Sequence, residues 1–149
     1  MRHVQLNILK TCSSTNDVAI KNAKQGLPEG SSYLSYLQTS GRGRNNNRWE
    51  SMEGNLFLST IFRPTANKNN WHQLSLIIGL SMLEILVDFG IDRNKIELKW
   101  PNDLLVDKKK ISGILLESFD NFIVAGVGLN IVKTPQSENK WNTTRLNDH

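Results

Sequence analysis

The sequence predicts an α+β domain whose sheet is largely antiparallel or mixed. Short segments with alternating apolar residues predict strands, only two segments carry helical signals, and most strands follow one another without an intervening helix. A doubly wound parallel sheet would need a crossover, usually a helix, between successive strands. With 149 residues, of which 38% are hydrophobic, the chain is long enough for one domain with a substantial core.

The first half of the chain carries signals for one helix and three strands. Residues 3–8 alternate apolar with polar side chains, which is typical of a short strand. Side chains that favour helix caps follow, and the helix that they begin should end before Gly26. Two apolar runs, separated by a polar loop at residues 39–55, predict strands, and Pro64 ends the second. The expected elements are strands at 3–8, 31–38 and 56–62 and a helix at 18–24.

The second half contains the strongest helical signal. Apolar residues cover most of the circumference of residues 70–89, so we expect a largely buried helix that Gly90 ends. Alternation over 95–100 predicts a half-buried strand that Pro101 ends. The lysine-rich turn 107–110 should connect the two strands of a β-hairpin. The expected strands are 95–100, 104–106, 111–119 and 122–131.

Composition excludes several classes of protein. The single cysteine, Cys12, can form no intrachain disulfide, and no Cys/His spacing typical of zinc sites occurs. Polar residues interrupt the only long apolar segment, and the N-terminus lacks the features of a signal peptide. We therefore expect a cytoplasmic protein without a membrane span, with a domain at residues 1–132. The polar segment 133–149 is expected to be a tail or the start of a truncated C-terminal part.

Positive charge is concentrated in two parts of the chain. The net charge is +4, and eight of the eighteen lysines and arginines lie within residues 42–48 and 95–110. Such clusters can neutralise the phosphates of a nucleotide or of a nucleic acid, although a solvated surface is the commoner explanation of charge runs.

Residues 38–49 form the first segment with a chemical signature. Glycine alternates with arginine there, so the backbone can approach a ligand closely while forked guanidinium groups bind carboxylate or phosphate. Trp49 could form a wall for a flat ring. Because Arg–Gly runs also occur in nucleic-acid-binding segments, a non-catalytic basic module that binds RNA is an alternative explanation.

Two further segments place polar or small residues at strand ends. A proline directs the chain out of the strand at 95–100, so that Asn102 and Asp103 could hold a nucleotide or Mg²⁺, and the hairpin returns Lys110 to the same place. An ordinary turn would also explain this composition. Gly126 and Gly128 would let a ligand pack against backbone, although a bulge or close packing of the sheet would also explain them.

In this order, the motifs resemble those of the catalytic domain of biotin protein ligases. The resemblance covers residues 4–132 and implies a mixed sheet flanked by helices, of the class II aminoacyl-tRNA synthetase/biotin ligase type. It implies that ATP activates biotin as biotinyl-5′-AMP and that biotin then passes to a lysine of a biotin carboxyl carrier protein. The matching motifs are Ser14-Thr15-Asn16, residues 38–49, Lys99-Trp100-Pro101-Asn102-Asp103, Lys110 with Gly113-Ile114-Leu115-Leu116-Glu117, and Gly126-Val127-Gly128-Leu129-Asn130.

The resemblance also implies a role for each site residue. Arg42 and Lys110 would be the catalytic cations, and Asp103 would serve Mg²⁺. Ser14 and Thr15 could instead merely cap the following helix. The residues implied for biotin are Ser14, Thr15, Gln38, Gly41, Arg42, Lys110, Gly113, Leu115, Gly126 and Gly128. The residues implied for the nucleotide are Gly43, Arg44, Trp49, Asn102, Asp103 and Asn130.

The chain departs from the family pattern in two places. Members usually carry another glycine, often followed by a basic residue, where this chain has Asn45-Asn46-Asn47, but asparagine tolerates the left-handed conformation well enough to keep the loop shape. Members also continue with further helices and a small β-barrel, so a truncated homologue that binds biotin without turnover is an alternative. A lipoate-protein ligase is another alternative. No winged helix is present, so we expect no specific DNA binding, and a homodimer is compatible with the sequence.

Overall fold

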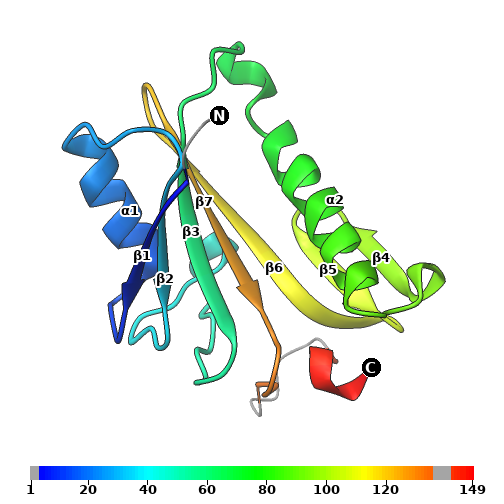
Figure 1. Ribbon diagram of the computed structural model, residues 1–149. Coiled ribbons are helices and arrows are strands. Elements are labelled where there is room, and N and C mark those ends of the chain that lie inside the picture. The colour runs from blue at the N-terminus through cyan, green and yellow to red at the C-terminus, as the bar shows by residue number, and fades with distance from the viewer. Residues whose placement is uncertain (1–3, 136–141) are drawn as a thin grey trace.

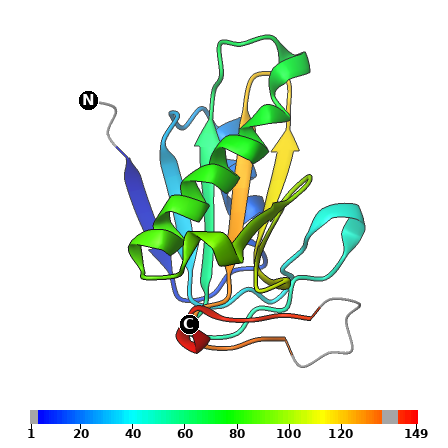
Figure 2. The same ribbon diagram turned by 90° about the vertical axis from the view of Figure 1, so that its right-hand side faces the viewer.

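The computed structural model describes residues 4–135 and 142–149 and contains one mixed sheet of seven strands. Helices flank this sheet on both faces, with α2 in front of it and α1 behind it in Figure 2. The predicted α+β class with a mixed, helix-flanked sheet is therefore confirmed. The strands are β1 Gln5–Leu9, β2 Ser31–Ser35, β3 Leu56–Phe62, β4 Ile96–Lys99, β5 Asp103–Val106, β6 Lys109–Ser118 and β7 Ile123–Leu129, and the helices are α1 Thr15–Lys24 and α2 Gln73–Asp88.

The strand order is β1-β2-β3-β7-β6-β5-β4 (Figure 1). The α1 crossover makes β1 and β2 parallel, whereas every other neighbouring pair is antiparallel. All the predicted strands and helices are present within the described residues, which exclude residue 3. Strand β2 ends at Ser35, earlier than predicted, because the chain leaves the sheet and pairs Gln38 with Cys12 in an isolated bridge.

Each helix covers a different hydrophobic cluster. Under α1, Tyr33, Ile61 and Val124 are buried, and under α2 the cluster centres on Leu86 and Leu104. The sheet residues that face α1 therefore alternate with those that face α2, as the period of a strand requires. The site lies on the α1 face of the sheet. Gly113, Leu115, Gly126 and Gly128 occupy this face, because they alternate in step with Val124 along β6 and β7.

The prediction that the second helix is largely buried is wrong for its outer half. Helix α2 packs on β4, β5 and β6 through Gly79, Met82 and Leu86, whereas Ile77 and Leu80 are exposed. The helix lies across one part of the sheet, so only one of its apolar faces meets the core (Figure 1). Residues 68–88 would pass for a membrane span by length and composition, but this buried face belongs to the core of the domain.

The described part of the polar C-terminal segment runs back along the sheet. Asn142 O accepts a hydrogen bond from Lys110 N, and Thr144 N donates to Lys110 O. Thr144 is buried, and Leu146 packs against the cluster under α2. The segment therefore contacts the domain closely, while a boundary at residue 132 stays a prediction.

The buried hydroxyl of Tyr33 provides a test of the core beneath α1. Its Oη has no hydrogen-bond partner among the described residues, and desolvation by burial raises the pKa of Tyr33 above its ordinary value. We expect Tyr33→Phe to raise the free energy of unfolding by about 1 kcal/mol, because it removes an unpaired polar group.

The raised pKa also fixes the sign of the pH dependence. As the pH rises past about 10, Tyr33 ionises in the unfolded chain before it ionises in the folded protein, which lowers the free energy of unfolding. Urea melts at pH 7 and at about pH 10.5 should show a larger loss for the wild type than for Tyr33→Phe. Equal losses in the two proteins would contradict this account.

Candidate functional site

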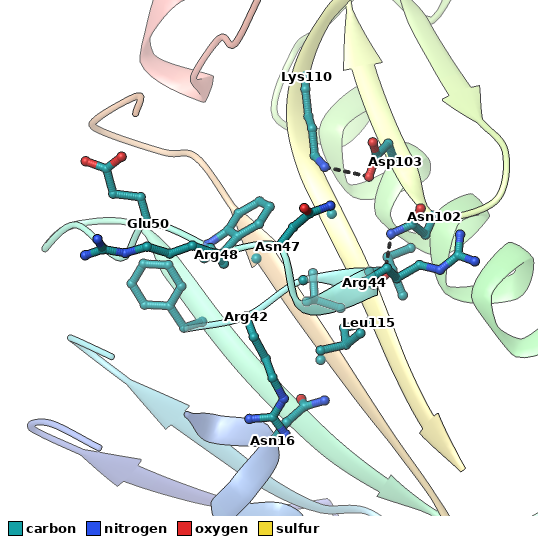
Figure 3. Close-up of a pocket in the computed structure, with 18 of the residues that line it drawn as sticks. Asn16, Arg42, Arg44, Asn47, Arg48, Glu50, Asn102, Asp103, Lys110 and Leu115 are labelled. Carbon is teal, nitrogen blue, oxygen red and sulfur yellow. Dashed lines mark hydrogen bonds and ion pairs between the residues drawn. The ribbon is translucent and has the colours of Figure 1, made fainter. Parts of the chain in front are cut away.

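One cavity of about 1010 Å³ lies on the α1 side of the sheet, between the start of α1, loop 39–55 and the β5–β6 hairpin (Figure 3). It is lined by all the residues expected to bind biotin or nucleotide except Gly41. Gly41 lies behind the lining, where a Cβ would come within 2.6 Å of Trp49 O. Segments that are far apart in the sequence therefore meet at one pocket.

A buried hydrogen-bond network begins at the first residues of α1. Thr15 donates from its backbone N and from Oγ1 to Gln38 Oε1, over 2.8 and 3.1 Å. Gln38 Nε2 donates in turn to Ser51 Oγ at 3.1 Å. Ser14 occupies the N-cap position, but its side chain makes no capping hydrogen bond. Capping therefore does not explain why serine stands there, and its buried side chain lines the pocket.

Arg42 is held by carboxylates of the protein itself. Its Nη2 donates to both oxygens of Glu117 at 3.0 and 2.9 Å, and its Nη1 lies 2.7 Å from Asp17 Oδ1. Burial alone would lower the pKa of Arg42, but the hydrogen bonds and charges of Glu117 and Asp17 outweigh it and raise that pKa. In Figure 3 the Arg42 side chain points towards Asn16 and away from Lys110.

Lys110 and Asp103 form an ion pair at the other end of the pocket. Lys110 Nζ lies 2.7 Å from Asp103 Oδ1, and the side chains are only 20% and 15% exposed. The same ammonium lies 5.4 Å from the centre of the Trp49 ring. Strands β5 and β6 are antiparallel, and Asp103 lies opposite Gly113. Lys110 lies further along the ladder, opposite Leu105, so its long side chain reaches back along the strands to Asp103. A cation is therefore fixed inside the cavity rather than on its rim.

The two asparagines expected near the nucleotide line the same end. Asn102 Nδ2 donates to Ile114 O at 2.9 Å, and Asn130 Nδ2 donates to Thr144 O at 3.2 Å. Arg44 is exposed on loop 39–55, and Figure 3 shows it on the side of the pocket where Asn102 lies.

Two side chains lie on the glycine floor of the pocket. A Cβ on Gly113 would lie 2.9 Å from Trp49 Cζ3, and one on Gly128 would lie 2.5 Å from Trp49 Cε2. A Cβ on Gly126 would overlap Asn16 Oδ1. These glycines are thus needed for close packing of Trp49 and Asn16 in this structure. The indole Nε1 is buried without a hydrogen-bond partner among the described residues.

Residues 41–49 form a closed hairpin-like loop. Trp49 N donates to Gly41 O at 2.9 Å, and Gly43 N donates to Asn47 O at 2.7 Å. Asn45 adopts the left-handed conformation, with φ of 55°, which asparagine tolerates better than most residues. The expectation that asparagine keeps the shape of this loop therefore agrees with the backbone at Asn45.

The described residues offer only a sparse set of ligands for a metal ion. No group of three or more His, Cys, Asp or Glu side chains gathers anywhere in residues 4–135 and 142–149. Asp103 and Glu50 are the carboxylates that line the pocket among the described residues, and only Asp103 lies next to Lys110, which pairs with one of its oxygens. This fits Mg²⁺ held mainly by phosphate oxygens and water, with one protein carboxylate, rather than a cage built by the protein.

Sequence reasoning missed several residues of the site. Asn16 and Glu117 stood within recognised motifs but had no role assigned to them, and Asp17 lies one residue beyond its motif. Pro135 and Thr143 also line the pocket, although no local pattern marks them. Their positions depend on the return of the C-terminal segment to the sheet, which spacing along the chain does not reveal.

Comparisons with known proteins agree on one family. Residues 8–131 match the biotin/lipoate A/B protein ligase family. The biotin–[acetyl-CoA-carboxylase] ligase of Mycobacterium tuberculosis is 33% identical over 136 residues, which cover 89% of this chain and 51% of that protein. The chain spans between 37% and 56% of the length of eight curated relatives.

Solved structures agree with the family match. Biotin protein ligase from Leishmania major in complex with biotinyl-5-AMP has a TM-score of 0.86 at 28% identity, over 99% of this chain and 65% of that one. The Aquifex aeolicus enzyme in complex with biotin and ATP has a TM-score of 0.83 at 32% identity, over 98% and 61%.

Proposed function

Because the chain belongs to the biotin/lipoate A/B protein ligase family, we propose that it joins biotin to AMP and passes the biotin to a lysine of a carboxyl carrier protein. The observation that carries this proposal is the convergence of the motif residues on one cavity with a half-buried lysine, Lys110, at one end. Relatives of the same fold bind biotinyl-5-AMP, or biotin with ATP, which supports the same substrates here.

The proposed reaction has two steps. A carboxylate oxygen of biotin attacks the α-phosphorus of ATP, the bond to the pyrophosphate oxygen breaks, and pyrophosphate leaves with the electron pair. The amine of the acceptor lysine then attacks the biotinyl carbonyl carbon, loses a proton and releases AMP. Mg²⁺ would accompany the triphosphate as part of the substrate.

The first step brings two anions together, so it needs fixed positive charge more than proton transfer. Lys110 is suited to this task, because Asp103 holds its ammonium at a defined place inside the cavity. Arg42 is less suited, since two carboxylates, those of Glu117 and Asp17, pair with it and leave the group with a net negative charge. Lys110 has the single carboxylate of Asp103 as its ion-pair partner. Arg44 is exposed on the loop and could add a second cation at the nucleotide end.

The polar end of the pocket favours biotin over lipoate. Ser14, Thr15 and Gln38 place a hydroxyl and amide network beside the cavity. The ureido ring of biotin offers N–H donors and a carbonyl acceptor to such groups, whereas the dithiolane ring of lipoate offers neither. A site built to hydrogen-bond a ligand rejects an analogue that leaves its polar groups unpaired.

Other parts of the proposal concern setting and partners. ATP as a substrate and a single cysteine are in keeping with a cytoplasmic protein. The name of the Mycobacterium tuberculosis relative supports a subunit of acetyl-CoA carboxylase as the acceptor. The RNA-binding alternative is weakened for one of its three arginines, because Glu117 and Asp17 already pair with Arg42.

Thermal unfolding with each ligand tests the choice of substrate. Biotin with Mg·ATP should raise Tm by several degrees, because a ligand that binds only the folded state stabilises it by mass action. Lipoate with Mg·ATP should give the same Tm as Mg·ATP alone. Single-stranded RNA should not reduce the shift that biotin with Mg·ATP produces. A larger rise in Tm with lipoate than with biotin would contradict biotin as the substrate and favour lipoate.

Transfer is measured separately with a carboxyl carrier domain as acceptor. The expected product is an acceptor domain that reacts with streptavidin and is heavier by one biotinyl group. Stabilisation by biotin without any modified acceptor would contradict the transfer step and favour a homologue that binds without turnover.

A further inference from the structure

Arg42 connects the loop at residues 41–49 to two other elements of the fold. Glu117 on β6 binds its guanidinium through both carboxylate oxygens, and Asp17 on α1 pairs with its other nitrogen at 2.7 Å. By contrast, Arg44 and Arg48 in the same loop are exposed. Charge-assisted, forked contacts of this kind are among the strongest hydrogen bonds that a side chain forms.

The carboxylate of Glu117 is itself fixed in place. Asn16 Nδ2 donates to Glu117 Oε2 at 2.7 Å, and Ser59 Oγ donates to Asn16 Oδ1 at 2.5 Å. Gly126 leaves the space that the Asn16 amide needs, since a Cβ there would overlap it. Residues from α1, β3, β6 and β7 thus build a rigid receptor for the guanidinium.

Backbone contacts within the loop connect Arg42 to Trp49, which lies over the pocket floor. Arg42 pairs with Arg48 in an isolated bridge, and Trp49 N donates to Gly41 O at 2.9 Å. Trp49, at the end of this closed loop, lies over Gly113 and Gly128. Holding Arg42 therefore holds the indole over the floor of the cavity.

We infer that Glu117 is a positioning residue that fastens loop 41–49 over the pocket through Arg42. Asp17 contributes a second, more exposed ion pair to the same guanidinium. The role of Glu117 in catalysis rests on the proposed function: a fastened loop retains biotin and the adenylate, whereas a released loop lets them leave. Glu117 touches no reacting atom in this account, so its loss weakens binding more than it slows the chemical step.

Limited proteolysis without ligand tests the fastening directly. Trypsin cleaves after Arg44 and Arg48, and mass spectrometry follows each bond separately. In Glu117→Gln we expect cleavage at these two bonds to be roughly tenfold faster, which corresponds to the loss of about 1.4 kcal/mol of loop attachment. Cleavage after exposed Lys68, far along the chain, should keep its wild-type rate.

Two further variants keep this test decisive. Glu97 lies on β4 and forms an exposed ion pair with Lys108. Glu97→Gln removes the same charge there and should leave the loop as resistant to trypsin as in the wild type. Asp17→Asn alters a carboxylate that is 46% exposed, so it should fold normally and loosen the loop to a smaller extent. Unchanged cleavage at Arg44 and Arg48 in both Glu117→Gln and Asp17→Asn would overturn the inference.

Steady-state kinetics give a readout that a purely structural role would not move. We expect Glu117→Gln to raise KM for biotin roughly tenfold while kcat stays within about threefold, and Glu117→Asp to recover part of the loss. A large fall in kcat with unchanged KM would contradict a positioning role. If the wild type binds no biotin, the proposed function fails, but the proteolysis result still decides whether Glu117 fastens the loop.

Discussion

Lys110→Ala is expected to slow the formation of biotinyl-5′-AMP by about 100- to 1,000-fold, the usual cost of removing one group that stabilises charge in a transition state. The ammonium of Lys110 is held at 2.7 Å from Asp103 inside the cavity and beside the Trp49 ring. Among the described residues, Lys99 is the only other lysine that lines the pocket. Single-turnover measurement of adenylate formation reports this step.

The neighbouring lysine provides the matched control. Lys109 precedes Lys110 on β6, but its side chain is exposed, so Lys109→Ala should keep the wild-type rate. Melting curves should show that both variants fold, since loss of Lys110 leaves Asp103 without its partner. Equal rates for Lys110→Ala and the wild type would remove Lys110 from the mechanism.

Gly128→Ala is expected to have the second largest effect. The new methyl group would lie 2.5 Å from Trp49 Cε2 and Cζ2, so the indole has to leave the floor of the pocket. Overpacking of this kind costs about 1–3 kcal/mol, which corresponds to roughly 5- to 150-fold in affinity for a ligand that needs the closed loop. Calorimetric titration with biotin measures the change.

Gly79→Ala is a suitable control for this substitution. It places a methyl group 2.9 Å from Leu98 Cδ2, under α2 and on the opposite side of the sheet from the pocket. Leu98 Cδ2 is the end of a flexible side chain, so it can move aside, and biotin affinity should stay unchanged. If Gly128→Ala binds biotin as tightly as Gly79→Ala, close packing of Trp49 on Gly128 is not needed for binding.

Most of the fold could be predicted from local patterns. Period-two alternation marked the strands, and the turn at residues 107–110 marked the hairpin between β5 and β6, because these signals need only neighbouring residues. The exposed side of α2 could not be predicted in this way. Its apolar residues surround the helix, and only the sheet decides which of them meet a partner.

The convergence of the motif residues on one pocket was predictable, but the direction of Arg42 was not. An arginine in a glycine-rich loop can face a ligand anion or a carboxylate of the protein, and the spacing is the same in both cases. Glu117 lies 75 residues away in sequence, so only the register of β6 brings it to Arg42. The roles implied by the resemblance stay predictions, and the partners of Arg42 add a new one.

The most direct test of the central claim is to incubate the 149-residue chain with biotin and Mg·ATP and identify the products by mass spectrometry. The account predicts biotinyl-5′-AMP with an equal amount of pyrophosphate, and neither product from Lys110→Ala at the same time point. Absence of the adenylate from the wild-type reaction, together with no heat of binding when biotin is titrated alone, would contradict it.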